Sequence, residues 1–341
     1  MGEPIIELQG VSKHYRVLER GPGVAGFLRG LVRPRWRSIT ALRAIDLRID
    51  AGSIVGYIGP NGAGKSTTIK IVAGVLRPSS GLVRVAGRDP QQQRIAHQLE
   101  LGVVLGQRSQ LLWDLPVRES LLYHGRVYRI PAPDLARRTD ELVALFGIVD
   151  LLDQPVRQLS LGQRMRCNLA LNLLHRPRVL LLDEPTIGLD FDARDSLREA
   201  VRTAAHTFGT TVLLTSHDLA DVEALSDRLV ILHQGGIIFS GTRRELFQQY
   251  RIHPTIHVSA AAETEQIRAW LLGVPGVEAV SQGEGACVIA YDEERTSPAR
   301  ITALLFQKTD LSDFSLHKPT IEDIVRSVYQ RQGEPTAPVA S

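Results

Sequence analysis

The sequence has few of the features that mark secreted, membrane-spanning or zinc-scaffold proteins. Only two cysteines, Cys167 and Cys287, occur in 341 residues, which excludes a disulfide framework and a four-cysteine zinc site. No apolar run approaches the roughly 18 residues of a membrane helix. The N-terminus has no basic segment followed by an apolar core, so we expect no secretory signal. A net charge of +3 is too small to indicate nucleic-acid binding.

The apolar residues fall into a pattern typical of an α/β protein. Short, continuous apolar runs alternate with segments of helical pattern; they lie at 53–58, 179–182, 211–215 and 229–232. Such runs predict a mostly parallel core sheet that is covered on both faces. Residues 5–17 and 41–49 alternate between apolar and polar, which predicts strands with one buried face. Residues 108–174 are rich in helical pattern.

The character of the chain changes after Tyr250, and His253-Pro254 marks a predicted boundary. We predict a large domain over 1–250, a small α+β domain over 254–330 and a flexible tail over 331–341. The small domain shows strands at 255–259, 277–281, 286–291 and 312–316 and helices at 263–272, 297–307 and 320–330. This order predicts a ferredoxin-like arrangement. Its histidines, His257 and His317, and Cys287 lack metal-ligand spacing, and we interpret them as structural.

A phosphate-binding pattern follows the first apolar run. Residues 59–67 fit G-x-x-x-x-G-K-[ST] between a predicted strand and a predicted helix. The glycines let backbone N–H groups curl around phosphates, and the helix N-terminus adds positive potential. A simple glycine-rich turn is the alternative, which this context disfavours. Lys65 is expected to reach the β- and γ-phosphates and Ser66 to bind Mg²⁺. The predicted nucleotide contacts are Gly59, Pro60, Asn61, Gly62, Ala63, Gly64, Lys65, Ser66 and Thr67.

Two carboxylates follow the second apolar run. Asp183 and Glu184 come directly after Val179 to Leu182, at the strand end where α/β sheets bind ligands. We expect Asp183 to hold Mg²⁺ through water and Glu184 to orient and deprotonate the attacking water. Acidic residues after a strand are also common helix caps. Their combination with the phosphate-binding loop favours the catalytic interpretation.

A third motif separates this chain from other nucleotide hydrolases. Residues 159–164 read Leu-Ser-Leu-Gly-Gln-Arg. Here the chain resembles the ABC ATPases, whose signature reads LSGGQ. The resemblance implies that Ser160, Gly162 and Gln163 contact the γ-phosphate of ATP bound by a second subunit. Leu161 departs from the usual glycine, but its backbone N–H is retained, so we expect function to be retained.

Further motifs occur in the order that this resemblance implies. Gln107 resembles the glutamine that contacts Mg²⁺ and the permease interface, with Gln110 as the alternative. Asp190 ends a segment, 185–190, that resembles the family's D-loop, and His217 resembles the histidine that contacts the γ-phosphate. Tyr15 resembles the aromatic residue that stacks on adenine, although an aromatic residue near a strand end is commonly a core residue. The resemblance covers residues 4–250 and implies a P-loop ABC-ATPase fold with a parallel core sheet, an antiparallel β subdomain and an α-helical subdomain.

The motif flanks, including Arg164-Met165-Arg166-Cys167, and Lys318 to Asp323 resemble ATPases of ABC-2-type export systems. The resemblance implies ATP and Mg²⁺ as ligands, a homodimer or a pair with a similar ATPase, and a separate six-helix membrane permease. It implies a cytoplasmic protein held at the inner face of the membrane, with no nucleic-acid partner. A basic insert at 18–39 mixes five arginines with apolar residues. It suits a segment near anionic lipid or a permease loop, or equally a solvated loop.

Two other classes compete with this interpretation. A soluble ABC ATPase acting on DNA or ribosomes would carry long coiled coils, zinc-binding cysteines or two cassettes, and this chain has none of these patterns. A small P-loop kinase or GTPase leaves the Ser160 segment unexplained, and the sequence lacks the guanine-reading Asn-Lys-x-Asp. We therefore predict the ATP-hydrolysing subunit of an ABC transporter. The transported substrate is not encoded in these motifs.

Overall fold

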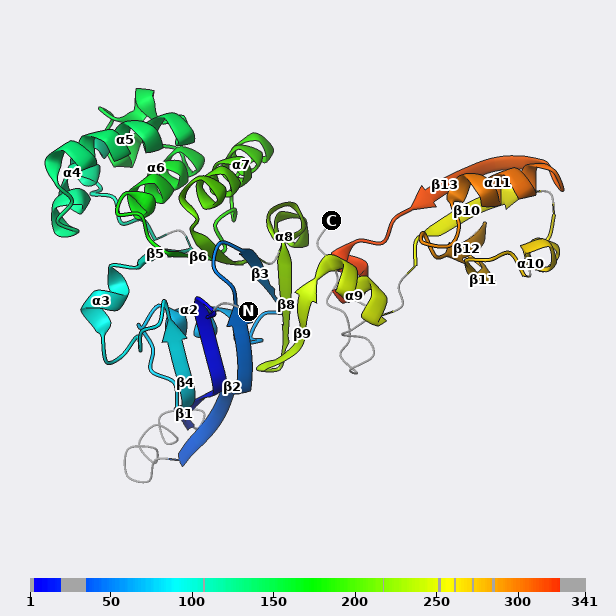
Figure 1. The fold of residues 1–341 in the computed structure, drawn as a ribbon, viewed down its shortest axis with the longest axis horizontal. Helices are drawn as coiled ribbons and strands as arrows, with labels where there is room; N and C mark the ends of the chain where they lie inside the picture. Colours follow the sequence, from blue (N-terminus) through cyan, green and yellow to red (C-terminus); the bar gives the residue numbers. More distant parts are fainter. Residues whose placement is uncertain are drawn as a thin grey trace, which may run out of the picture. The chain divides into compact units, whose positions relative to one another are not determined.

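The computed structural model describes residues 3–19, 35–106, 108–216, 218–250, 253–260, 262–271, 273–283 and 286–325. The chain divides into two compact units, Met1–Thr242 and Arg243–Ser341 (Figure 1). The helix α9 (Arg243–Tyr250), which the sequence placed in the first domain, groups with the second unit. The domain limits of 1–250 and 254–330 remain a prediction, because the division into compact units does not test which segments fold independently. No helix in the described residues is both long and apolar enough to cross a membrane.

The first unit is built on a six-stranded sheet in the order β5-β6-β7-β3-β8-β9 (Figure 1). Its strands are β3 (Ile54–Ile58), β5 (Leu101–Leu105), β6 (Val179–Asp183), β7 (Thr211–Thr215), β8 (Arg228–His233) and β9 (Gly236–Thr242). All pairs are parallel except β8 with the edge strand β9. The central strands β3 and β7 are buried along their whole length, which explains their continuous apolar runs.

A second, antiparallel sheet has the order β2-β1-β4, with β1 (Ile6–Glu19), β2 (Arg35–Ile49) and β4 (Ser80–Val85). β1 and β2 run beyond the predicted strands, and their pairing continues as far as Glu19 with Arg35. The ends of the predicted insert at 18–39 are thus strand, which corrects the sequence interpretation. The extension depends on the pairing of the two strands with each other, for which the local sequence gives little signal. The middle of the insert, 20–34, lies outside the described residues.

Helices complete the first unit. Their bounds are α2 (Lys65–Val72), α3 (Arg94–Gln98), α4 (Val117–Val127), α5 (Ala132–Phe146), α6 (Leu161–Leu173), α7 (Phe191–Phe208) and α8 (Leu219–Leu225), with short 3-10 turns at Val149–Leu151 and Val156–Gln158. α2 lies between the two sheets and shares one core with both, through Ile69 and Ile71. α4, α5 and α6 lie together at one end of the unit (Figure 1), within the helix-rich segment that the sequence predicted.

The second unit contains a four-stranded antiparallel sheet in the order β11-β12-β10-β13. Its elements are β10 (Thr255–Ala260), α10 (Thr264–Leu271), β11 (Val277–Gln282), β12 (Cys287–Tyr291), α11 (Pro298–Phe306) and β13 (Leu311–His317). This is the predicted strand and helix order. Strand residues such as Ile256 and Ile289 pack with Ile301 and Leu305 of α11 in a separate core. Of the helix predicted at 320–330, residues 321–325 are helical and the remainder is not described.

Candidate active site

The phosphate-binding loop joins the buried strand β3 to α2, as the sequence predicted. Its conformation depends on glycine at two positions, since Gly62 and Gly64 have φ angles of +81° and +111°. A Cβ on Gly64 would also lie 2.7 Å from the Ala41 carbonyl oxygen and 2.6 Å from Leu42 Cδ2. The loop therefore adopts a turn that a side chain at Gly64 would prevent. Such a turn before a helix N-terminus directs N–H groups toward an anion.

Lys65, the first residue of α2, is the cation of this loop. Its side chain is buried, and Nζ donates hydrogen bonds to the carbonyl oxygens of Gly59 at 2.7 Å and Pro60 at 3.2 Å. Burial lowers the pKa of Lys65, while the negative charges of Glu184 and Asp183 oppose that shift. The ammonium group thus lies within the loop, next to the carboxylates of β6. Phosphate oxygens of a bound nucleotide can take the place of these carbonyl acceptors.

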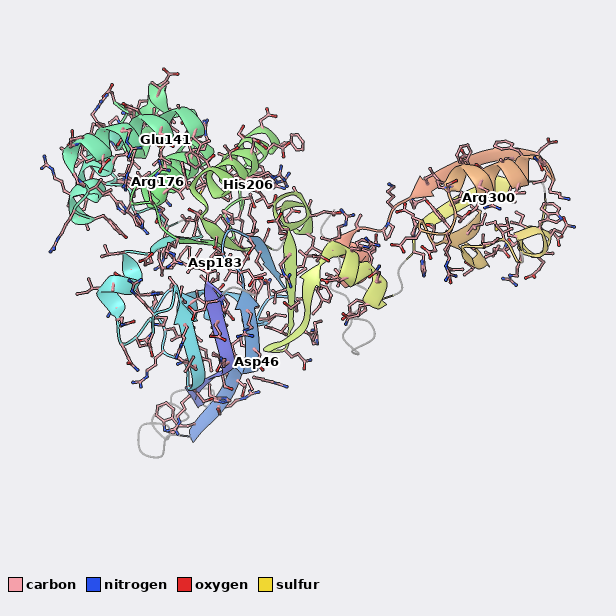
Figure 2. The ribbon with its side chains drawn as sticks, in the orientation of Figure 1. Asp46, Glu141, Arg176, Asp183, His206 and Arg300 are labelled. Atoms are coloured by element: carbon pink, nitrogen blue, oxygen red, sulfur yellow. The ribbon has the colours of Figure 1, made fainter. Side chains whose placement is uncertain are left out.

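Asp183, labelled in Figure 2, lies at the end of β6 beside the loop. Its Oδ1 accepts hydrogen bonds from Ser66 Oγ at 3.3 Å and from Thr215 Oγ1 at 2.6 Å. A hydroxyl and a carboxylate at this separation are the hard oxygen donors that Mg²⁺ prefers, together with water and phosphate oxygens. The residues present therefore fit a Mg²⁺ ion held by Ser66 and Asp183. Among the described residues, no group of three or more His, Cys, Asp or Glu side chains forms a separate metal site.

Glu184 follows Asp183 in an unusual backbone conformation. Its φ of 53° lies in the left-handed region, which is strained for a residue with a side chain. Its backbone N–H donates to both the carbonyl oxygen and the hydroxyl of Thr215, at 3.0 and 3.2 Å. These bonds hold the turn, so the Glu184 side chain projects from a fixed point next to Lys65. A fixed carboxylate beside a phosphate site can orient an attacking water.

The Ser160 segment forms the N-terminus of α6. Ser160 Oγ accepts from Gln163 N at 3.2 Å, and Gln163 Oε1 accepts from Ser160 N at 2.9 Å, which is a complete capping box. Gly162 lies against α7, where an added Cβ would approach Ala193 Cβ to 2.9 Å. Leu161 occupies the first helical position and is half-buried. Hydrogen bonds of Ser160 and Gln163 in the described residues thus stay within α6 and do not reach the phosphate-binding loop.

The other predicted site residues lie in different parts of the first unit, and two of them are not described. Asp190 caps α7, since its Oδ1 accepts from Ala193 N at 2.8 Å. Tyr15 is on β1, 36% exposed, with the Lys13 ammonium 5.3 Å from its ring centroid. Gln107 and His217 lie outside the described residues. The alternative to Gln107, Gln110, donates its side-chain amide to the Val103 carbonyl oxygen at 2.9 Å.

Two buried residues that hold the segments of this site together were not identified from the sequence. Thr215 and Asp221 are both buried, and each connects segments that are distant in sequence. Thr215 lies at the end of a predicted strand, two residues before His217, and that place is the only signal that the sequence offers. Asp221 reads as an ordinary acidic residue in the first turn of α8.

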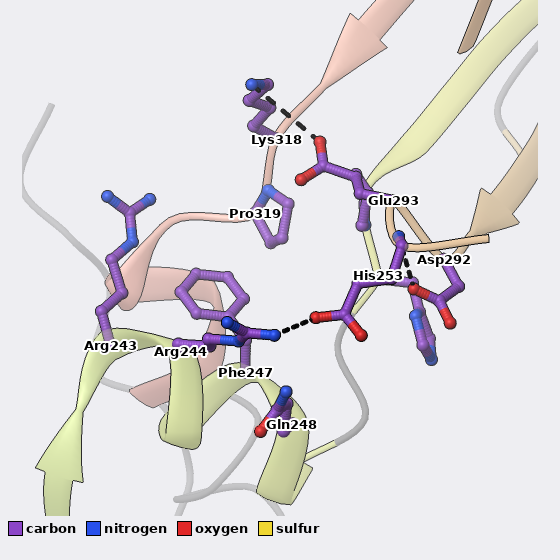
Figure 3. A pocket seen from close by; sticks show the side chains of 11 residues that line it. Arg243, Arg244, Phe247, Gln248, His253, Asp292, Glu293, Lys318 and Pro319 are labelled. Atoms are coloured by element: carbon purple, nitrogen blue, oxygen red, sulfur yellow. Dashed lines mark hydrogen bonds and ion pairs between the residues drawn. The ribbon is translucent and has the colours of Figure 1, made fainter. Parts of the chain in front are cut away.

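A large cavity is found elsewhere, within the second unit (Figure 3). It has a volume of about 820 Å³, and its lining includes Phe247 and two ion pairs, Arg244 with Glu294 and Lys318 with Glu293. None of the predicted site residues that the structure describes lines it. The chemistry described above argues for the phosphate-binding loop as the active site, because that loop combines a cation, a carboxylate pair and directed N–H groups.

Known proteins are similar to this chain in both sequence and fold. The ABC transporter family profile matches residues 42–187. The daunorubicin resistance ATP-binding protein DrrA3 of Streptomyces coeruleorubidus is 33% identical over 290 residues, covering 85% of this chain and 91% of that protein. The Fe(3+) ions import ATP-binding protein FbpC of Vibrio cholerae is 34% identical over 214 residues, covering 63% of this chain and 60% of that protein.

Among solved structures, cbiO1 from Clostridium perfringens, part of the ABC transporter complex cbiONQ, has a TM-score of 0.60 and 25% identity. The match covers 80% of this chain and 96% of that chain. These likenesses confirm the predicted fold class, the ATPase activity and the ligands ATP and Mg²⁺. The chain belongs to the ATP-binding proteins of ABC transporters.

Proposed function

We propose that this chain energises export through a separate membrane permease, by ATP-driven closure of two copies or of a pair with a similar ATPase. The observation that carries the proposal is the division of the site within one chain. Lys65 and Ser66 of the phosphate-binding loop lie beside Asp183 of β6, whereas Ser160 caps α6, and its hydrogen bonds to other described residues stay at that helix end. A second copy supplies the Ser160 end to the γ-phosphate, so ATP joins the two subunits and hydrolysis releases them.

Each predicted site residue has a role in this proposal. Residues 59–67 bind the phosphates, Tyr15 stacks on adenine, and Ser160, Gly162, Gln163 and Asp190 complete the site from the partner side. Ser66, Asp183 and Gln107 hold Mg²⁺. Glu184 accepts the proton of the attacking water, and His217 contacts the γ-phosphate.

Export is favoured by the length of chain over which each relative is similar to this protein. A match of 290 residues with the resistance protein is longer than the 242 residues of the first unit, so it extends into the second unit. The match of 214 residues with the iron import protein is short enough to lie within the first unit. The second unit is thus a feature shared with a protein named for drug resistance. A soluble ATPase acting on nucleic acid or ribosomes is not favoured by these relatives.

A permease partner is supported by exposed apolar side chains near α3 and α4. Ile95 is 82% exposed, and Leu99, Trp113, Leu115 and Tyr123 are each at least 45% exposed. Isolated apolar residues are common on surfaces, but this part of the chain presents several large ones in a short stretch. We propose that they contact a six-helix permease, which would hold the chain at the inner face of the membrane.

Copurification tests this proposal. The chain would be expressed with the membrane protein encoded beside its gene, and the complex would be captured in detergent. Trp113→Glu combined with Tyr123→Glu should reduce capture about tenfold, because charges at an apolar interface core are poorly tolerated. Val149→Glu is the matched control, since Val149 is 63% exposed on the same helical subdomain. Equal capture of both variants, or no capture of the parent chain, would contradict the proposal.

A further inference from the structure

Asp221 is a buried carboxylate, only 1% exposed, that receives hydrogen bonds from three separate segments. The hydroxyl of Thr186 donates to its Oδ2, and Ser216 Oγ lies 3.4 Å from the same oxygen. Arg198 of α7 donates to the other oxygen, Oδ1, from Nε at 2.9 Å and also from Nη2. One side chain of α8 therefore connects α7 with the segments that follow β6 and β7.

Two of these segments are next to the chemistry. Thr186 lies two residues after Glu184, in the turn that leaves β6. Ser216 directly follows Thr215, whose hydroxyl binds Asp183, and it directly precedes position 217. Ser216 Oγ also accepts the Asp218 backbone N–H at 3.0 Å. The Asp221 carboxylate thus connects the turn after Glu184 with the segment that follows β7, up to Ser216.

A helix-capping role does not explain this arrangement. Asp221 lies in the first turn of α8, where an acidic residue commonly bonds back to the N-cap backbone. Here both oxygens are engaged by Thr186, Ser216 and Arg198 instead. The cap itself is made by Asp218, whose Oδ1 accepts from Ala220 N at 3.0 Å.

The charge of Asp221 is balanced inside the protein. Arg198 is 16% exposed and also bonds Asp195 at 2.7 Å, which is half exposed. Buried charges are expensive unless paired and hydrogen-bonded, and apolar residues could fill the same space more simply. Hydrogen bonds, in contrast to apolar contacts, fix direction as well as distance. A fully bonded carboxylate therefore suits a place where two loops need a defined separation.

We propose that Asp221 is a positioning residue for ATP hydrolysis, which holds the turn after Glu184 and the segment before position 217 in one geometry through Thr186 and Ser216. The inference rests on the ATPase activity of the family and on the proposed role of Glu184. Asp221 is buried and bonded to Thr186, Ser216 and Arg198, so it acts through these residues on the rate of the chemical step and leaves the phosphate-binding loop unchanged.

The test measures kcat, KM and nucleotide affinity for the full chain with ATP and Mg²⁺. Asp221→Asn should lower kcat about tenfold or more and leave the Kd for ATP within about twofold, as expected when transition-state geometry alone is lost. Thr186→Val and Ser216→Ala should each lower kcat less. Asp221→Asn combined with Thr186→Val should be no slower than Asp221→Asn, because both remove the same connection. Asp221→Glu should have a higher kcat than Asp221→Asn, because it keeps a carboxylate at this position.

Asp195→Asn is the matched control, since it removes another carboxylate from Arg198 but touches neither Thr186 nor Ser216. It should leave kcat unchanged. The proposal is overturned if Asp221→Asn and Thr186→Val hydrolyse ATP at the parent rate, or if kcat and ATP affinity fall together with the folded fraction. If Asp221→Asn does not fold, Thr186→Val and Ser216→Ala decide. Brisk hydrolysis by Glu184→Gln would instead contradict the proposed function, independently of these variants.

Discussion

The hydroxyl of Thr215 donates a 2.6 Å hydrogen bond to Oδ1 of Asp183, the oxygen that also lies 3.3 Å from Ser66 Oγ. The contact exists because β6 and β7 are parallel neighbours in which Asp183 lies opposite Thr215. It orients the carboxylate before any metal binds. Partners of metal-binding carboxylates commonly tune affinity in this way.

Thr215→Val should therefore raise the Mg²⁺ concentration for half-maximal ATPase activity about tenfold, because Asp183 loses the bond that orients it. Thr210→Val is the control, since Thr210 is also buried, lies directly before the same strand and donates to the Pro177 carbonyl oxygen at 2.9 Å. The measurement is ATPase rate against free Mg²⁺. Equal Mg²⁺ requirements in both variants would show that the Thr215 bond has no such role.

Glu184→Gln should bind ATP and lower kcat at least about a hundredfold, because the amide cannot accept the proton of the attacking water. ATP should then hold two copies together, since release depends on hydrolysis. Light scattering with and without ATP and Mg²⁺ measures the association, and phosphate release measures kcat. Rapid turnover in this variant would remove Glu184 from the role of base.

Ser160→Ala should have two separable effects. Loss of the N-cap should lower the free energy of unfolding by about 1 kcal/mol. Loss of the Ser160 hydroxyl should also lower ATPase activity if it reaches the partner's nucleotide. Ser297→Ala is the matched control, because Ser297 caps α11 in the second unit through Arg300 N at 3.3 Å. A variant of Ser297 with the same loss of activity would assign the effect of Ser160 to stability alone.

Stability should fall in mild acid because of two buried histidines in the helical subdomain. Burial is the main reason why the pKa of His124 and of His175 is lowered to about 4; for His175 the hydrogen bond to Leu101 opposes the shift, and the charges of His124 and Arg138 add to it. Tyr128 stacks on His175 with centroids 3.9 Å apart, and the His175 Nε2–H donates to the Leu101 carbonyl oxygen at 2.7 Å. Both rings are therefore neutral in the folded chain at pH 5.

The sign follows from proton uptake. Between the ordinary histidine pKa of 6.5 and the folded value of about 4, the unfolded chain binds more protons. The free energy of unfolding should thus decrease from pH 6.5 to pH 4 by several kcal/mol, at most about 7 kcal/mol for the two rings together. His124→Phe should reduce this dependence, whereas the exposed His206, labelled in Figure 2, should not matter when changed to Gln. Urea unfolding at pH 7 and pH 5 gives the change in the free energy of unfolding for the parent chain and for each variant. The same change in the parent and in His124→Phe would contradict the assignment.

The parts of the fold predicted best were those with a local signal. The loop from Gly59 to Gly64 and the strand before Asp183 combine a pattern with a backbone requirement, so their positions followed from a few residues. The extension of β1 and β2 to Glu19 and Arg35 had no such signal, because strand pairing depends on a partner that is distant in sequence.

The site was predicted less completely than the fold. Gln163 was predicted as a nucleotide contact, and its side chain closes a capping box on Ser160. Both roles use the same spacing, which also fits S-x-x-Q. Asp221 was not found, because only the tertiary structure brings Thr186 and Arg198 to one carboxylate. Supports of this kind depend on long-range contacts, whereas motifs depend on neighbours.

The central claim, that one nucleotide is held by the phosphate-binding loop of one copy and the Ser160 end of another, can be tested by crosslinking. One chain would carry Asn61→Cys and the other Gln158→Cys, both exposed positions, whereas the native Cys167 and Cys287 are buried. A short thiol crosslinker should join the mixed chains when a non-hydrolysable ATP analogue and Mg²⁺ are present, and neither variant alone. Absence of that product with nucleotide, or equal yield without nucleotide, would contradict the account.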